Sequence, residues 1–382
     1  MTIFILIFLL LLVAYSILID YYRRAWNAIP EPKPDGSARV KVSVVIAARN
    51  EETNIPGLLS CLDAQDYPKE LFEVIIVDDH STDNTWQLLS SFQRSVNLRT
   101  IQLSPGTTGK KKAIELAVNA ASGNLVVQTD ADCTMSARWL GTIASFYEQT
   151  GAKFIAAPVV IRGGNSFRHV FESLDFLTLQ AITGASVFRR FHTMCNGANL
   201  AFEKSAFEEV DGFDGIDQIP SGDDMLLMHK IYLAYPEKVF YLKQFAAIVS
   251  TLPQPSWKHL LHQRVRWASK AVHYKDKRIF YVLLITYIIN VAFMALAVTA
   301  IINVYWLPFL ILFISAKILI EFPFVNGGAQ FFGERRLMKW FPIMQPVHII
   351  YVIIAGWLGR FGSYEWKSRV IKNNATGNLA KQ

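Results

Sequence analysis

The sequence has few cysteines and few charged residues for its length. Its 382 residues include three cysteines, Cys61, Cys133 and Cys195, which are odd in number and lie far apart, without metal-ligand spacing. This pattern argues against a disulfide framework and a cysteine metal site, and we expect small core side chains in a reducing cytosol. Charged residues make up 18% of the chain and hydrophobic residues 52%. This balance predicts a soluble domain combined with membrane segments.

The net charge of +7 does not indicate nucleic acid binding. The lysines and arginines gather beside apolar segments, at 23–24, 258–277, 335–339 and 360–372. Such a distribution is typical of contacts with anionic lipid headgroups. We therefore expect membrane lipids and no nucleic acid as partners.

The chain also lacks charge before its first apolar run, Ile3 to Ile19. A cleaved signal peptide has charge before the run, whereas here tyrosines and arginines follow it. We expect a retained transmembrane helix over residues 1–24, with its carboxyl end in the cytoplasm. Pro30, Pro32 and Pro34 indicate a stiff linker over residues 25–40.

The carboxyl-terminal third is again apolar. Residues 254–277 mix aromatic and basic side chains and predict an amphipathic helix at the membrane surface. Residues 278–362 contain two spans that break near Asn303, and a third candidate from Phe341 to Leu358. A third crossing would place the basic tail, residues 363–382, outside, against the positive-inside tendency, so a re-entrant or interfacial segment is the alternative. No span shows a buried charge pair, which disfavours a transporter.

We expect one soluble domain over residues 41–253. From residue 41 to about residue 160 short apolar runs alternate with helical patterns, which predicts βαβ units and a parallel sheet. The expected strands are Val42–Ala47, Glu73–Val77, Leu98–Leu103, Asn124–Thr129 and Phe154–Val160. Asp130 and Asp132 follow the fourth of these strands. In extended geometry both carboxylates point to one side, where they suit a hard cation such as Mg²⁺ or Mn²⁺. Alone, such a pair is more often a solvated turn.

Several ordered motifs resemble those of the family 2 glycosyltransferases, membrane-anchored inverting enzymes. The resemblance covers roughly residues 42–267, and its motifs are Val44-Val45-Ile46-Ala47-Ala48-Arg49-Asn50-Glu51, Val77-Asp78-Asp79-His80-Ser81-Thr82-Asp83, Gly109-Lys110, Thr129-Asp130-Ala131-Asp132, Gly222-Asp223-Asp224 and Gln263-Arg264-Val265-Arg266-Trp267. It implies a GT-A fold, a Rossmann-like α/β nucleotide-diphospho-sugar transferase domain, between amino- and carboxyl-terminal transmembrane helices.

The resemblance also implies a role for each motif residue. Asp132, helped by Asp130, would hold a divalent metal that bridges the donor's two phosphates. The residues that would bind the nucleotide-sugar are Ala47, Arg49, Glu51, Asp78, Asp79, Lys110, Asp130, Gln263 and Arg266. A turn or helix N-cap is the alternative for Asp78, and an ordinary surface charge is the alternative for Arg49.

In this family the aspartate of an acidic pair takes the proton from the acceptor hydroxyl, and it falls on Asp224 here. Glutamate is commoner at the position of Asp223, so either carboxylate of this pair is a candidate base, and a helix N-cap is the alternative. Asp223 would most simply orient the acceptor or support the site electrostatically. Trp267 would stack on the acceptor sugar, and an interfacial anchor is its alternative.

The leading hypothesis is a metal-dependent inverting transferase that uses a nucleotide-diphospho-sugar, with a UDP-sugar as the first candidate. It would act on a lipid-linked or glycan acceptor in cell-envelope glycan biosynthesis, at the cytoplasmic face of the plasma (inner) membrane. Only about three apolar segments follow the catalytic domain, which favours single transfer over a processive polysaccharide synthase. A non-catalytic nucleotide-sugar sensor is the alternative from another class.

Overall fold

The computed structural model describes residues 2–33, 36–92, 97–216, 222–269 and 276–361, and the backbone of three short strands between 363 and 381. Pro34, Ser221, Lys270, Tyr274 and the side chains of the expected basic tail lie outside the described residues. The chain forms two compact units. We call residues 29–162 and 186–252 the sheet unit, and residues 1–28, 163–185 and 253–382 the helical unit.

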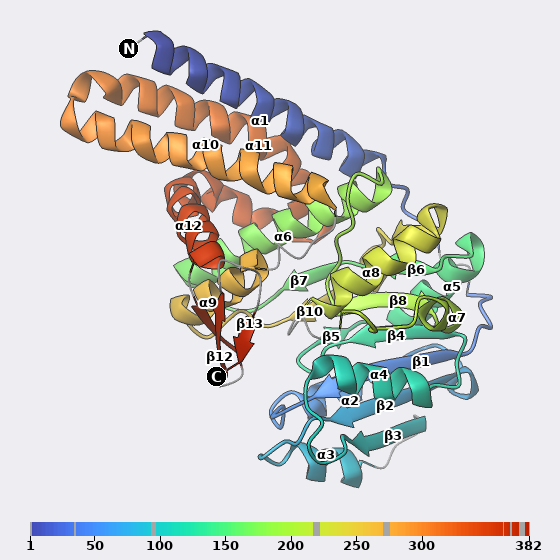
Figure 1. Ribbon diagram of the computed structural model, residues 1–382. Coiled ribbons are helices and arrows are strands. Elements are labelled where there is room, and N and C mark those ends of the chain that lie inside the picture. The colour runs from blue at the N-terminus through green and yellow to red at the C-terminus, as the bar shows by residue number, and fades with distance from the viewer. Residues whose placement is uncertain are drawn as a thin grey trace. The chain divides into compact units, whose positions relative to one another are not determined.

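A seven-stranded sheet forms the core of the sheet unit (Figure 1). In spatial order its strands are β3 (Asn97–Gln102), β2 (Phe72–Asp78), β1 (Val42–Ala48), β4 (Leu125–Thr129), β8 (Asn199–Glu203), β6 (Phe154–Ala156) and β9 (Val239–Tyr241). The pairs from β3 to β4 are parallel, which confirms the expected βαβ half. The sheet as a whole is mixed, because β8, which the sequence did not predict, runs antiparallel to both β4 and β6, and β6 therefore runs in the same direction as β4.

The prediction of one strand over Phe154–Val160 is wrong, because these residues contribute two short strands to two different sheets. The chain leaves β6 at Ala156, and β7 (Val159–Ile161) joins a second sheet in the order β5 (Thr134–Met135), β10 (Val249–Thr251), β7. Pro158 lies between them and cannot donate a backbone hydrogen bond to a sheet. Its carbonyl accepts from the Val249 amide at 3.1 Å instead.

Helices connect these strands. They are α2 (Ile55–Asp63), α3 (Thr85–Ser91), α4 (Lys110–Ala120), α5 (Trp139–Thr150), α7 (Lys204–Glu209) and α8 (Asp223–Ala234), with 3₁₀ turns η1 (Lys69–Leu71), η2 (Pro236–Lys238) and η3 (Phe245–Ala247). The helix α4 packs on β1 and β2 through Ala113, Ile114, Ala117 and Val118 (Figure 1). Since those strands are parallel, their carboxyl ends and the start of α4 meet at one edge.

Glu73, in β2, is a buried acid that joins neighbouring strands. Its Oε1 accepts from the Ser43 hydroxyl at 2.7 Å and from the Ser122 amide at 2.6 Å and hydroxyl at 2.7 Å. Burial alone would raise the pKa of Glu73, but these hydrogen bonds and the charge of Arg99 lower it. Glu73 is therefore ionised in the folded protein at neutral pH.

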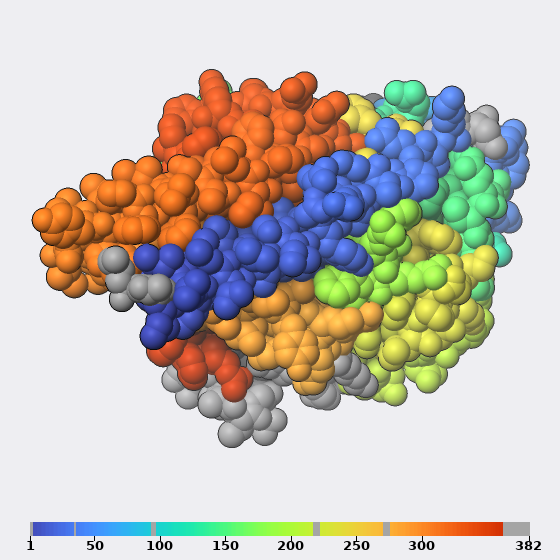
Figure 2. Space-filling model, turned by 90° about the horizontal axis from the view of Figure 1, so that it is seen from above, coloured from blue at the N-terminus to red at the C-terminus, as the bar shows by residue number. Residues whose placement is uncertain are grey.

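The helical unit consists mainly of long apolar helices. They are α1 (Thr2–Ala28), α6 (Phe167–Phe188, which ends in the sheet unit), α9 (Trp257–Ala268), α10 (Lys277–Ile302), α11 (Leu307–Phe331) and α12 (Phe341–Phe361), with η5 (Val304–Trp306), η6 (Arg335–Trp340) and strands β11 (Ser363–Trp366), β12 (Arg369–Asn373) and β13 (Leu379–Lys381). In Figures 1 and 2, α1 in blue lies against α10 and α11 in orange. Within the described residues four segments are long and apolar enough to cross a membrane, Ile3–Ala28, Lys277–Ile302, Val304–Phe331 and Arg335–Phe361. They fit the expected membrane anchors at both ends of the chain.

The interpretation that no span holds a buried charge pair is wrong. On α11, Lys317 is fully buried and donates to Glu321 Oε1 and to Gln345 Oε1, each at 2.6 Å. Gln345, on α12, donates to Glu321 Oε2 at 2.8 Å, and the Tyr15 hydroxyl of α1 donates to Glu321 Oε1 at 2.5 Å. Three membrane helices therefore meet at one satisfied polar network.

Candidate active site

Two acids end β2 at the carboxyl edge of the sheet. Asp78 and Asp79 are both buried. Asp79 Oδ2 accepts from the Gly109 amide at 3.0 Å and lies 3.5 Å from the Arg49 guanidinium. Gly109 has φ +111°, a conformation that favours glycine, so its amide can turn toward the acid just before α4. Among the described residues, none donates a hydrogen bond to Oδ1 of either acid, so both have an acceptor left for a ligand.

The acids after β4 lie beside the start of α4. Lys110 Nζ contacts Asp130 Oδ1 at 2.5 Å. Burial, the charge of Asp130 and the charge of Glu51 raise the pKa of Asp132 to about 6. Glu51, which follows β1, is therefore close enough to act on the same acids. Three sequence-predicted acids, Glu51, Asp130 and Asp132, share this edge with Lys110, and the repulsion among the acids is the electrostatic condition that a bound cation relieves.

The acidic pair that begins α8 reaches the same lysine. Burial lowers the pKa of Lys110, but Asp130, Asp223 and Asp224 outweigh that effect and raise it, so the amine stays charged. Asp223 is buried, and within the described part of the chain its Oδ2 has no hydrogen-bond donor. Asp224 is the more exposed of the two. The ends of β4 and the starts of α4 and α8 thus bring Lys110 and the acids together.

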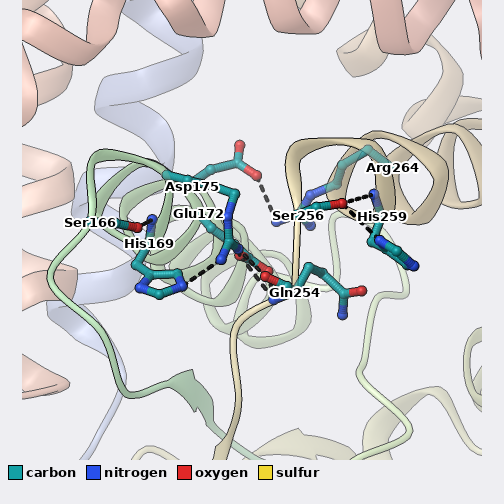
Figure 3. Close-up of polar contacts among 9 residues, drawn as sticks. Ser166, His169, Glu172, Asp175, Gln254, Ser256, His259 and Arg264 are labelled. Atoms are coloured by element: carbon teal, nitrogen blue, oxygen red, sulfur yellow. Dashed lines mark hydrogen bonds and ion pairs between the residues drawn. The ribbon is translucent and has the colours of Figure 1, made fainter.

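The remaining predicted residues, Gln263, Arg266 and Trp267, lie on α9 in the helical unit. One buried side chain of this helix, to which the sequence gave no role, forms an ion pair with α6. Arg264 is buried, stacks on the Trp267 ring at 4.1 Å and forms an ion pair with Asp175 of α6 at 2.8 Å. Figure 3 shows Arg264 pointing toward Asp175.

A second contact joins the segment before α9 to α6. The Gln254 amide donates to both carboxylate oxygens of Glu172, at 3.0 and 3.1 Å (Figure 3). Burial is the main cause that raises the pKa of Glu172. The position of α9 within the helical unit therefore depends on two acids of α6, Glu172 and Asp175, which the sequence showed only as parts of a helical pattern.

Comparison with known proteins agrees with this geometry. Residues 43–211 match the model of Glycosyl transferase family 2. The match covers 169 of the 382 residues and assigns this segment of the chain to the family. The described sites after β1, β2 and β4 fall inside the matched segment, whereas Asp223, Asp224 and α9 follow it.

The alignments with individual curated proteins cover only part of each protein. The chain is 36% identical over 110 residues to the poly(ribitol-phosphate) β-N-acetylglucosaminyltransferase TarS of Staphylococcus aureus, which covers 29% of the chain and 19% of TarS. It is 26% identical over 256 residues to the probable glycosyltransferase YdaM of Bacillus subtilis, 65% of the chain and 59% of YdaM. The chain thus spans less than two thirds of these curated relatives.

A solved relative supports the fold. The mannosyltransferase PcManGT from Pyrobaculum calidifontis superposes with a TM-score of 0.58 at 20% identity, covering 91% of this chain and 96% of that one. At this identity the likeness concerns the fold alone, and it agrees with the GT-A fold expected for family 2.

The carboxylates at this edge of the sheet supply only some of the ligands that a divalent cation needs. In the described residues, no three His, Cys, Asp or Glu side chains form a ready metal cluster. Asp130 and Asp132 supply two carboxylates, and burial followed by the charge of Asp130 raises the pKa of Asp132. Two carboxylates suit Mg²⁺ or Mn²⁺ when substrate phosphates complete the shell.

The site also includes groups that sequence reasoning missed. Gly197, in the loop before β8, lies between Lys110 and Asp224, and its amide donates to Asp224 Oδ2 at 2.8 Å. Gln128, inside β4, donates to the Gly197 carbonyl at 3.0 Å. The only sequence signal was the break in helical pattern at residues 196–199, since a buried glutamine in a strand has no chemical signature of its own.

Proposed function

We propose that this family 2 protein is a metal-dependent inverting glycosyltransferase. It transfers one sugar from a nucleotide-diphospho-sugar, with a UDP-sugar as the first candidate, to a lipid-linked or glycan acceptor. Its catalytic unit acts at the cytoplasmic face of the plasma (inner) membrane. The observation that carries the proposal is the convergence of Lys110 with Asp130, Asp223 and Asp224 at the carboxyl edge of the sheet.

In this proposal Asp224 is the general base. Inversion requires a base on the face of the sugar opposite the leaving diphosphate. Asp224 is more exposed than Asp223, and backbone amides donate to both of its oxygens, Gly197 to Oδ2 and Met225 to Oδ1, each at 2.8 Å. Those contacts hold the Asp224 carboxylate in one orientation. Asp223, buried beside it, supports the acceptor hydroxyl.

The donor would lie along the edge formed by β1, β2 and β4. Asp78 and Asp79 have free carboxylate oxygens that suit the N–H and hydroxyl groups of a base and ribose. Asp130 and Asp132 would hold the divalent metal, which when bound neutralises charge that develops on the leaving diphosphate. Lys110 stays protonated and adds a second positive charge at the same place.

Relatives guide the choice of donor and acceptor to test. PcManGT was solved with GDP-mannose and Mn²⁺, and TarS is named for N-acetylglucosamine transfer. A β-monoglucosyldiacylglycerol synthase of Nostoc, 30% identical over 110 residues, is named for a lipid product. Together with four candidate membrane helices, these names support a panel of UDP- and GDP-sugars against membrane lipids.

The test is transfer by purified full-length protein with Mg²⁺ or Mn²⁺ and a membrane lipid extract. We expect one sugar per acceptor with inverted anomeric configuration, read by mass spectrometry and NMR. Asp224→Asn should lower kcat about 10²–10⁴-fold. Asp214→Asn, an exposed aspartate outside the site, is the matched control and should retain activity.

Three outcomes would contradict the proposal in different ways. Long glycan chains from one enzyme molecule would favour a processive synthase. Tight nucleotide binding without turnover on any acceptor would favour a sensor. Full activity of Asp224→Asn would remove Asp224 from the role of base.

A further inference from the structure

The loop at residues 196–199 is fixed by side chains from strands on either side of it. Thr129 Oγ1 donates to the Ala198 carbonyl at 2.8 Å, and Gln128 Nε2 donates to the Gly197 carbonyl at 3.0 Å. Asn199 Nδ2 donates to the carbonyls of Pro158 and Ala247, each at 2.8 Å. The backbone of this loop therefore has a defined position relative to β4.

Gln128 and Thr129 differ in what their contacts reach. The amide of Gly197 donates to Asp224 Oδ2 at 2.8 Å, so the residue whose carbonyl Gln128 holds also orients the acid. Thr129 donates to the next carbonyl along the loop, that of Ala198. The backbone amide of Ala198 donates to Asn196 Oδ1 at 3.0 Å. The two strand residues thus fix the same loop, but only Gln128 is linked to Asp224 through a single residue.

The space around Gly197 is narrow as well as polar. A Cβ at this position would lie 3.1 Å from Lys110 Nζ, 3.3 Å from Gln128 Nε2 and 3.4 Å from Asp224 Oδ2. Three polar groups from α4, β4 and α8 thus meet over one glycine. Small changes in the backbone conformation of Gly197 would move Asp224 relative to Lys110.

We propose that Gln128 is a positioning residue that sets the carboxylate of Asp224 through the backbone of Gly197, whose carbonyl and amide lie in the two peptide groups on either side of its Cα. A buried amide in a strand is costly unless it is hydrogen-bonded, and here its donor serves the one loop residue that contacts the acid. The inference rests on the proposed function, since it assigns Asp224 as the base. Gln128 does not touch the substrate.

The experiment compares two substitutions in the full-length protein. Gln128→Met removes the donor and keeps the length of the side chain, and Thr129→Val removes the matched donor to the neighbouring carbonyl. We expect Gln128→Met to lower kcat about 10–100-fold with the donor KM unchanged, because a displacement of about 1 Å near the chemistry costs up to about 100-fold. Thr129→Val should lose much less in kcat at a similar thermal stability.

A second arm separates positioning from general damage. If Gln128 acts through Asp224, Gln128→Met should cause no further loss, less than about 2-fold, in the Asp224→Asn background, because residues that act as a unit are strongly non-additive. Equal losses in Gln128→Met and Thr129→Val, or a full additional loss in the Asp224→Asn background, would overturn the inference while leaving the transferase intact. Wild-type protein that transfers no sugar would overturn the proposed function and the inference with it.

Discussion

Replacing Lys317 by methionine should destabilise the membrane helices strongly. The substitution keeps the length of the side chain but removes the ammonium group that donates to Glu321 and Gln345 at 2.6 Å each. Glu321 then stays buried with two neutral donors, Gln345 and Tyr15, and no positive partner. An uncompensated charge among apolar helices is the main source of the expected loss.

The magnitude follows from what each variant leaves behind. Breaking a buried ion pair on one side costs about 3–5 kcal/mol, and we expect about 3 kcal/mol for Lys317→Met because Glu321 keeps two hydrogen bonds. Glu321→Gln should cost a similar amount, since it leaves Lys317 buried and charged. The double variant removes both charges, so its loss should be at least about 2 kcal/mol smaller than the sum of the two singles.

The assay is unfolding of the detergent-solubilised full-length protein by titration with sodium dodecyl sulfate, with refolding checked. Thr299→Val is the matched control, because this half-buried threonine donates to the Ala295 carbonyl of its own helix at 2.8 Å, and its loss should change stability by less than about 0.5 kcal/mol. Additive losses of less than about 1 kcal/mol for each single variant would refute the reasoning, since the two charges would then not depend on each other.

Three further predictions concern the sheet unit. Glu73→Gln should destabilise the protein by about 1–3 kcal/mol at pH 7, as measured by thermal melts. Because the folded-state pKa of Glu73 is lowered, the difference in stability between wild type and variant should disappear as the pH falls below roughly 4. A difference that does not depend on pH would contradict this prediction. Gly197→Ala should lower kcat at least about 10-fold with a small change in Tm, since the new Cβ would lie too close to Lys110 and Gln128; unchanged turnover would show that the space is not limiting. A chelator should abolish transfer, and Asp132→Asn should raise the metal concentration needed for half-maximal rate; turnover insensitive to chelation would exclude the metal role.

The parts of the fold that the sequence predicts are those with local signals. The strands β1, β2 and β4 are apolar runs that end in polar motifs, and the helices before and after them follow ordinary periodicity. The strand β8 has no such signal, because five residues that begin with Asn199 and end with Glu203 give too short a pattern. The split between β6 and β7 depends on which sheet each half joins, and this is decided by partners distant in the chain.

The same distinction applies to the sites. The acids Asp79, Asp130 and Asp224 were predictable because each lies in a short motif at the end of a strand or the start of a helix. Gln128 and Gly197 were not, since their role depends on contacts between residues far apart in the sequence. Lys317 and Glu321 are present in an apolar stretch of the sequence, but their burial as a pair follows from the packing of α1, α11 and α12 against one another.

The membership of α6 in the helical unit has a practical consequence. The sheet unit is interrupted between Arg162 and Ser186, so cutting the chain after Leu252 would not yield that unit alone. Such a fragment would still carry residues 163–185, whose buried Phe171, Leu174 and Leu177 would have lost the helices that they pack with. A soluble version for crystallisation should therefore bridge Arg162 to Ser186 with a short flexible linker, besides omitting both termini.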